Sequence, residues 1–239
     1  MTLGTIDASQ RKAARVAGFA FLFGMATVVI ANYGISFRLI VPGNAAQTAG
    51  NILAHETLFR LNIACDLIYV VSVVVLLAAL YVIQKPAGRN LALVATFFRL
   101  VFALMWGAAA LDMLTTLRLL GDASYLRVFE AGQLQALARV QISAGFDAYY
   151  AGLPFWGLAS TACSWLWLKS RYIPRSLAAF GVIASAWCVL CAFAYLIHPG
   201  FANTVGLSWF DEPMVMFEIA VGCWLLFKGL RPQPSSMVV

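Results

Sequence analysis

The stretch Leu61–Ile83 reads LNIACDLIYVVSVVVLLAALYVI and carries one charged residue, Asp66. A bilayer core about 30 Å thick is crossed by roughly 20 helical residues, since each residue adds about 1.5 Å of rise. The stretch is therefore long enough and apolar enough to form a transmembrane helix.

Five more segments have the same character, and we predict further spans at residues 16–37, 91–112, 145–168, 175–197 and 213–229. The whole chain is 62% hydrophobic and 11% charged, whereas a soluble domain carries roughly 25% charged residues. The sequence thus predicts an all-α integral membrane protein, a six-helix bundle forming one membrane domain over residues 1–239. Residues 231–239 are expected to form a short disordered tail.

Basic residues predict the orientation of this bundle. Ten lysines and arginines lie at one set of span ends and five at the other, with Arg99 inside a span. Because positive residues are retained on the cytoplasmic side, the richer side is predicted to be cytoplasmic, and six spans return the C-terminus to it. The expected location is the cytoplasmic membrane. The richer side holds Arg11, Lys12, Arg15, Lys85, Arg89, Lys169, Arg171, Arg175, Lys228 and Arg231, and the other holds Arg38, Arg60, Arg118, Arg127 and Arg139.

The loop between the third and fourth spans has an amphipathic pattern. From Ser124 to Val140, apolar residues recur at approximate helical spacing between charged ones. This pattern fits a helix lying on the outer membrane surface, and equally a helix that caps the bundle.

Four ionisable residues at membrane depth are the candidates for function: Asp66, Arg99, Asp147 and Glu218. Each costs a few kcal/mol at the bilayer centre and usually faces a partner or a wet cavity. If their helices are neighbours, they form a polar pocket open to the outer side, with Arg99 as counter-ion and anion contact.

Neutral side chains accompany these charges. Residues three and four apart share a helix face, which places Asn62 and Tyr69 beside Asp66, Tyr150 near Asp147, and Trp106 on the face of Arg99. Asp112 points away from Arg99, and we expect it to be a solvated helix end.

Several partners are disfavoured by the sequence. The basic residues flank apolar runs and form no stripe, so no nucleic acid is expected. Only His55 and His198 could supply imidazole, which is too few for a metal site, and no cofactor motif occurs. Membrane lipid is the expected partner, with a small-molecule ligand in addition; the oligomeric state is open.

A set of short motifs resembles a bacterial multi-pass membrane family known as domain of unknown function 4386. The resemblance runs from about Arg15 to Leu230, but residues 112–141 match none of its motifs, so it implies nothing for Asp147. It implies a multi-pass bacterial membrane protein and assigns no activity. The motifs are Asn51-Ile52-Leu53-Ala54, Leu58-Phe59-Arg60-Leu61, Cys65-Asp66-Leu67-Ile68, Leu91-Ala92-Leu93, Phe97-Phe98-Arg99-Leu100, Tyr172-Ile173-Pro174-Arg175, Phe217-Glu218-Ile219 and Trp224-Leu225-Leu226-Phe227-Lys228-Gly229.

Three functions follow as hypotheses. The first is binding or transport of a small polar or amphipathic molecule in the predicted pocket. The second is an intramembrane acid/base enzyme acting on a lipid or isoprenoid, with Asp66 or Glu218 delivering a proton. The third is a structural or accessory membrane subunit, in which Arg99 pairs with one acid only to lock the helices together.

Overall fold

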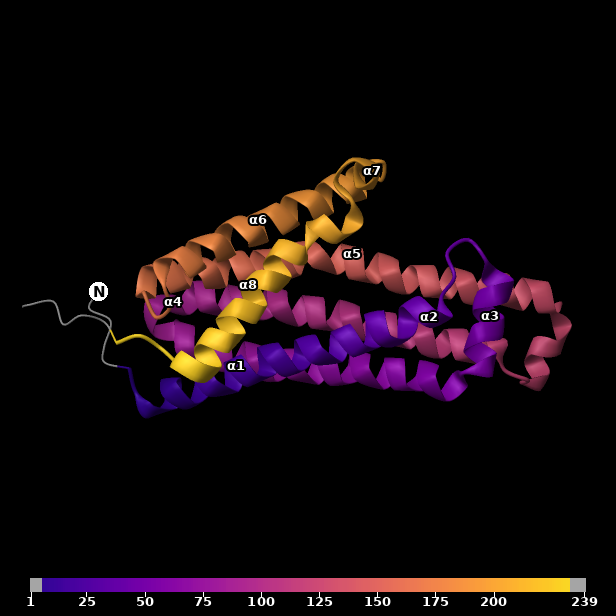
Figure 1. The fold of residues 1–239 in the computed structure, drawn as a ribbon, viewed down its shortest axis with the longest axis horizontal. Helices are drawn as coiled ribbons and strands as arrows, with labels where there is room; N and C mark the ends of the chain where they lie inside the picture. The colour runs from indigo at the N-terminus through magenta and orange to yellow at the C-terminus, as the bar shows by residue number, and fades with distance from the viewer. Residues whose placement is uncertain (1–5, 233–239) are drawn as a thin grey trace, which may run out of the picture. The chain divides into compact units, whose positions relative to one another are not determined.

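The computed structural model describes residues 6–232, and every regular element in that range is a helix (Figure 1). The all-α prediction is confirmed for these residues. In chain order the elements are α1 (Ala8–Val29), the π-helical η1 (Ile30–Ser36), α2 (Phe37–Leu39), α3 (Ala45–Ala54), α4 (Glu56–Leu120), the 3-10 helix η2 (Ser124–Val128), α5 (Ala131–Ser170), α6 (Arg175–Ile197), α7 (Phe201–Val205), the 3-10 helix η3 (Leu207–Phe210), α8 (Glu212–Cys223) and the π-helical η4 (Trp224–Lys228).

All six predicted spans lie on helical structure. The span predicted at 175–197 coincides with α6, which begins directly after Pro174, and the one predicted at 213–229 ends one residue beyond η4. Three others lie inside the longer helices α4 and α5, and the span predicted at 16–37 extends from α1 through η1 to the first residue of α2. Three stretches are long and apolar enough to cross a membrane, namely Ala8–Leu39, Glu56–Leu120 and Arg175–Ile197. The chain is thus suited to a membrane, and the count of six stays a prediction.

Two of the predicted spans belong to α4, on either side of a break. Gly88 leaves the helical conformation, with φ 175° and ψ 92°, two residues after Pro86. Proline has no N–H to donate and disrupts the helix in which it sits. Because Leu76 and Ile83 share an apolar cluster with Ala95, the two limbs pack side by side, and Figure 1 shows the chain reversing direction there. This break stands where a short loop between spans two and three was predicted.

The amphipathic segment 124–140 is not one separate helix, which corrects the prediction. Ser124–Val128 forms the 3-10 helix η2, and residues from Ala131 onward are the first turns of α5, which continues without interruption to Ser170. The backbone N–H of Glu130 donates to Gln133 Oε1 at 3.0 Å, which stabilises the start of α5 at this point. The long helix was divided wrongly because its polarity changes along its length.

The chain forms two compact units. Unit 1 comprises residues 1–23, 72–102 and 152–239, and unit 2 comprises residues 24–71 and 103–151. The prediction of a single membrane domain over residues 1–239 stays a prediction.

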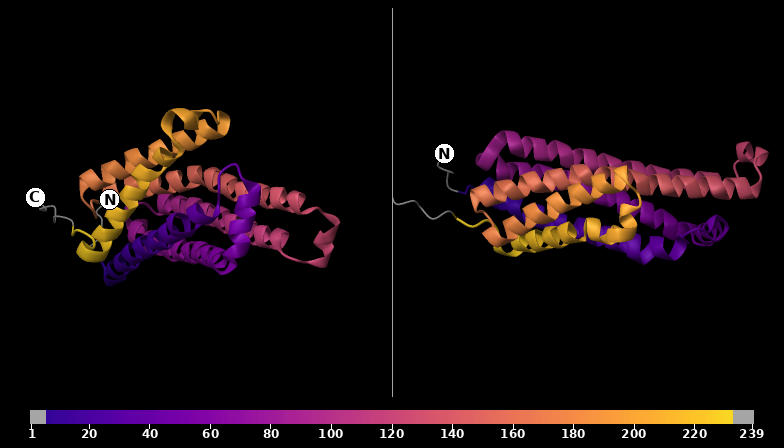
Figure 2. Two further views of the ribbon diagram at one scale, coloured as in Figure 1. Left: turned by 45° about the vertical axis from the view of Figure 1, so that its right-hand side comes forward. Right: turned by 90° about the horizontal axis from the view of Figure 1, so that it is seen from above.

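Unit 1 is built around an apolar cluster from α1, α4, α5, α6 and α8. Ala17, Ile83, Trp167 and Val221 are among its buried members. The helices α6 and α8 pack against each other, and they meet at their ends near α7 (Figures 1 and 2). Ile6 and Leu230, near the two ends of the described range, both pack against this cluster.

Hydrogen bonds join separate chain segments at one end of unit 1. The side-chain amide of Gln10 donates to the carbonyl of Ile83 at 3.2 Å and to the hydroxyl of Tyr172 at 3.3 Å. The backbone N–H of Arg231 donates to the carbonyl of Tyr172 at 2.8 Å. Arg231, the first residue of the predicted tail, is therefore held in place, while residues 233–239 of that tail lie outside the described residues.

Unit 2 has its own apolar cluster, in which Ile35, Phe59, Ala110 and Ile142 are buried together. Asp112, which was expected to be solvated, is half-buried instead, and its carboxylate accepts a hydrogen bond from Gln141. That expectation was wrong because the neighbouring face of α5 supplies a polar partner that sequence spacing along one helix does not show.

A glycine contact in unit 1 gives the first prediction. A Cβ on Gly18 would lie 2.5 Å from the backbone N of Leu226 and 2.8 Å from the carbonyl O of Gly222, and backbone atoms cannot move aside. We expect Gly18→Ala to lower the free energy of unfolding by about 1–3 kcal/mol, the usual cost of overpacking. The measurement is the thermal unfolding midpoint in detergent.

Gly50→Ala is the matched control, because a Cβ on Gly50 of α3 meets nothing within 4 Å. Alanine favours a helix over glycine, so this variant should unfold at the same temperature as the wild type or slightly above it. Equal midpoints for the two variants would contradict the close approach of α1 to η4.

Candidate functional site

Unit 1 contains a buried ion pair between Arg99 on α4 and Glu218 on α8. Arg99 Nη2 lies 2.9 Å from Glu218 Oε1, and the two side chains are 3% and 4% exposed. The same carboxylate oxygen accepts from Trp156 Nε1 at 2.9 Å and from Ser160 Oγ at 3.1 Å, both on α5. Arg99 Nη2 also donates to Ser160 Oγ at 2.8 Å. The pair therefore connects three helices through one oxygen.

Aromatic rings enclose this ion pair. The guanidinium of Arg99 lies 5.6 Å from the ring centroid of Phe21 on α1, within the range of a cation–π contact. Phe102 stacks on Trp156 with ring centroids 5.2 Å apart. The gap beside Arg99, bordered by Gln84 and Cys163 among others, has no room for a water molecule. The surroundings of the ion pair are thus closely packed.

Unit 2 contains a second buried charge, Asp66 on α4, with a different environment. Its Oδ1 accepts from Trp106 Nε1 at 3.0 Å, and its Oδ2 accepts from Asn62 Nδ2 at 3.1 Å. Asp66 is 9% exposed and Asn62 is 1% exposed. Within residues 6–232, Asp66 has no ion-pair partner. Both carboxylate oxygens are bonded to neutral donors.

The hydrogen-bond chain from Asp66 continues to η1. Ser36 Oγ donates to Asn62 Oδ1 at 2.9 Å, which fixes the orientation of the Asn62 amide so that its nitrogen faces Asp66. Ser36 is the last residue of the π-helical segment Ile30–Ser36. Such segments are rare and occur frequently at functional sites. The irregular backbone here therefore lies next to the hydrogen-bonded group formed by Asn62 and Asp66.

Aromatic side chains lie beside Asp66. The rings of Tyr69 and Trp106 have centroids 4.6 Å apart, and Tyr149 meets Trp106 edge-on at 5.4 Å. Tyr150 follows, with its ring 5.3 Å from that of Tyr149. A carboxylate and several ring faces are the groups that recognise an organic cation.

The predicted site residues divide between the units. In unit 2 the structure brings together Asn62, Asp66, Tyr69 and Trp106, with Tyr150 joined through Tyr149. In unit 1 it joins Arg99 to Glu218. Asp66 is not hydrogen-bonded to any of the other three charged residues. The shared pocket of all four charges stays a prediction.

Asp147 stands apart from both groups. It is exposed on α5, and its side chain makes no hydrogen bond or ion pair within residues 6–232. Its depth within a predicted span made it a candidate, but sequence spacing did not show which face of α5 it occupies.

Among the site residues, sequence reasoning did not name Trp156 and Ser160, which donate hydrogen bonds to Glu218. It also did not name Ser36, which bonds to Asn62, or Tyr149, which packs against Trp106. Trp156 and Ser160 are four positions apart and so share one face of α5, which was a usable signal. No sequence signal pointed to Ser36, because its contact with Asn62 depends on how η1 packs against α4. Among the described residues, no group of three His, Cys, Asp or Glu side chains could hold a metal ion.

The protein-family model described as Domain of unknown function (DUF4386) matches residues 16–229. The chain belongs to this family. The match includes both Asp66 and the Arg99–Glu218 pair, and the family description assigns no activity. A search of curated proteins and a search of solved structures each find no match. The function must therefore be argued from the residues themselves.

The ion pair gives the second prediction. Arg99→Gln or Glu218→Gln alone leaves its partner as an uncompensated buried charge, which typically costs about 3–5 kcal/mol of stability. We expect each single variant to show a large fall in thermal unfolding midpoint, measured in the same detergent as the wild type.

The control is Arg60→Gln, which breaks the exposed pair of Arg60 with Glu56, whose side chains are 59% and 48% exposed. An exposed pair contributes at most about 1 kcal/mol, so this variant should unfold close to the wild type. Similar midpoints for Arg99→Gln and Arg60→Gln would show that the buried pair does not stabilise the fold.

Proposed function

We propose that this protein binds or transports a small amphipathic molecule whose positively charged group is recognised by Asp66. The observation that carries the proposal is the buried carboxylate of Asp66, whose hydrogen-bond partners are neutral and which has no ion-pair partner within residues 6–232. An unpaired charge at membrane depth is costly, and a cationic ligand would compensate it.

The hydrogen bonds around Asp66 support an ionised acceptor. An ionised carboxylate only accepts hydrogen bonds, whereas a protonated one must also donate. Trp106 donates to one oxygen of Asp66 and Asn62 to the other, and the amide of Asn62 is oriented by Ser36. The site is thereby organised in advance to hold a negative charge.

The aromatic rings define the kind of cation that the site would favour. Tyr69 and Trp106 lie in contact, with Tyr149 at the edge of the indole. Ring faces attract ammonium groups and also bind apolar substituents. A lipophilic organic cation suits these groups better than a small hydrated ion.

The enzyme alternative has less support. General acid–base chemistry needs a positioned proton donor or acceptor beside the substrate, and usually a second titratable group. The hydrogen-bond partners of Asp66 are an indole and an amide, neither of which titrates. Glu218 is bonded to Arg99, Trp156 and Ser160 in closely packed surroundings. We assign the Arg99–Glu218 pair the structural role that the third hypothesis gave to Arg99.

We infer that both termini are cytoplasmic, that six spans cross the bilayer, and that the protein lies in the bacterial inner membrane, as the family resemblance implies. All ten basic residues of the predicted cytoplasmic side belong to unit 1, and all five of the other side belong to unit 2. Hydrogen bonds join the segments that carry the ten: Gln10 bonds to Ile83 and Tyr172, and Arg231 bonds to Tyr172. One end of unit 1 is therefore strongly basic, as a cytoplasmic end should be.

Reporter fusions test this topology. Green fluorescent protein fused at the C-terminus should fluoresce, because it folds in the cytoplasm. Alkaline phosphatase fused after Gly121, between α4 and η2, should be active, because that enzyme needs the extracytoplasmic side. Phosphatase activity of a fusion at the C-terminus would contradict the inferred orientation.

Ligand binding tests the function. The probe is tetraphenylphosphonium, a lipophilic cation, titrated calorimetrically into the purified protein. Because its charge would meet the Asp66 carboxylate, we expect saturable binding that weakens at least about tenfold in Asp66→Asn, equivalent to about 1.4 kcal/mol. Tetraphenylborate, an anion of the same shape, should not bind at this site.

Asp147→Asn is the matched control, since it removes the same charge from an exposed carboxylate in the same unit. It should bind tetraphenylphosphonium as the wild type does. Equal loss of affinity in both variants, or equal affinity for the cation and the anion, would overturn recognition by Asp66.

A further inference from the structure

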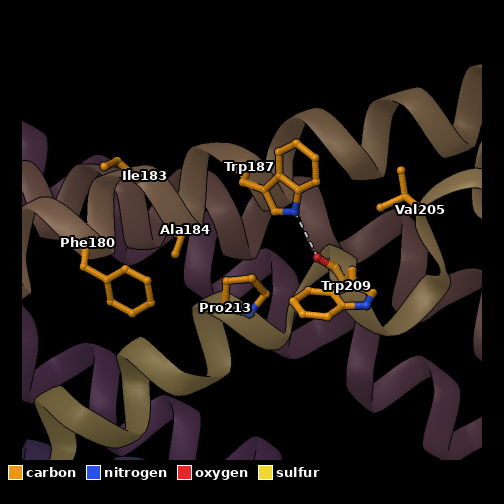
Figure 3. Close-up of a pocket in the computed structure, with 7 residues that line it drawn as sticks. All are labelled: Phe180, Ile183, Ala184, Trp187, Val205, Trp209 and Pro213. Atoms are coloured by element: carbon orange, nitrogen blue, oxygen red, sulfur yellow. Dashed lines mark hydrogen bonds between the residues drawn. The ribbon is translucent and has the colours of Figure 1, made fainter.

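Unit 1 has an open apolar groove of about 470 Å³ that is separate from the ion pair (Figure 3). One wall is a stripe on α6, with Phe180, Ile183, Ala184 and Trp187 at the spacing of one helix face. The opposite wall is formed by Trp209 of η3 and Pro213 of α8.

A short irregular segment closes one end of this groove. Gly206 has φ +80°, which permits the turn between α7, ending at Val205, and η3. The indole N–H of Trp187 donates to the backbone carbonyl of Trp209 at 2.9 Å, shown as the dashed line in Figure 3. This hydrogen bond holds η3 against α6, so the wall of the groove that Trp209 forms has a fixed position.

We propose that this groove binds one acyl chain of phosphatidylethanolamine. The groove runs along α6, which is long and apolar enough to cross a membrane, so that lipid hydrocarbon is the medium at its open side. From Phe180 to Trp187 the helix rises about 10 Å, enough for a stretch of an extended chain. Ile183 at the rim is 69% exposed, and Ala184 at the floor is 2% exposed.

The charged residues near the groove determine which lipid head group it would favour. Residues 176–227 contain no lysine or arginine, and the exposed Glu212 directly precedes Pro213 of the wall. The carboxylate of Glu212 disfavours an anionic lipid and attracts an ammonium group. The exposed Trp209 ring has the amphipathic character of residues at the boundary between lipid tails and head groups. Phosphatidylethanolamine combines an ammonium with the acyl chain that the groove would hold.

The test is native mass spectrometry of the full-length protein, delipidated in mild detergent and titrated with phosphatidylethanolamine or phosphatidylglycerol. We expect one saturable phosphatidylethanolamine adduct, with at least tenfold weaker binding of phosphatidylglycerol. Trp209→Ala removes an exposed wall residue but keeps the carbonyl that Trp187 binds, and Ala184→Phe fills the floor. Both variants should weaken the adduct at least tenfold.

Trp165→Ala is the matched control, because Trp165 and Trp209 are 57% and 60% exposed and both belong to unit 1. It should retain the adduct. Since Trp209 is exposed, its variant reports on binding even if Ala184→Phe does not fold. The proposal is overturned by the absence of a saturable adduct on the wild type, by an adduct that Trp209→Ala retains, or by tighter binding of phosphatidylglycerol.

Discussion

The ion pair of Arg99 and Glu218 is the interaction around which unit 1 is organised. Two opposite charges buried in a protein are tolerated when each is the other's counter-ion and further hydrogen bonds stabilise them. Here Trp156 and Ser160 of α5 share the carboxylate, and Phe21 of α1 covers the guanidinium. A substitution at either charge would therefore affect four helices at once.

Asp66 is also a buried charge, but it is stabilised in a different way. Its partners are the neutral donors of Trp106 and Asn62, so its charge is solvated by hydrogen bonds but not cancelled. The contrast between the two buried carboxylates is the basis for assigning them different roles. A cancelled charge stabilises packing, whereas a charge held by neutral donors can still attract a cationic ligand.

The positions of the helices were predicted well because a helix that crosses lipid must have a minimum apolar length. The predicted bounds of α6 agree with the structure at both ends. Asn62, expected beside Asp66, donates a hydrogen bond to it, and Tyr69 packs against Trp106. Trp106, expected on the face of Arg99, donates to Asp66 instead. What the sequence does not show depends on packing between helices. It left open which acid pairs with Arg99, wrongly placed Asp112 in solvent, and did not show that Asp147 is exposed on α5. The boundary between residues 124–140 and the fourth predicted span failed because hydropathy changes within one continuous helix, α5.

In the proposed arrangement, Asp66 recognises the ligand, and Arg99 and Glu218 only hold the fold together. The most direct measurement is the affinity of tetraphenylphosphonium for the double variant Arg99→Gln/Glu218→Gln, which removes both charges and keeps amide acceptors for Trp156 and Ser160. The account predicts a dissociation constant within about twofold of the wild type, a difference of about 0.4 kcal/mol. Loss of binding in a folded double variant would show that the ion pair takes part in the ligand site, and would contradict the separation of roles.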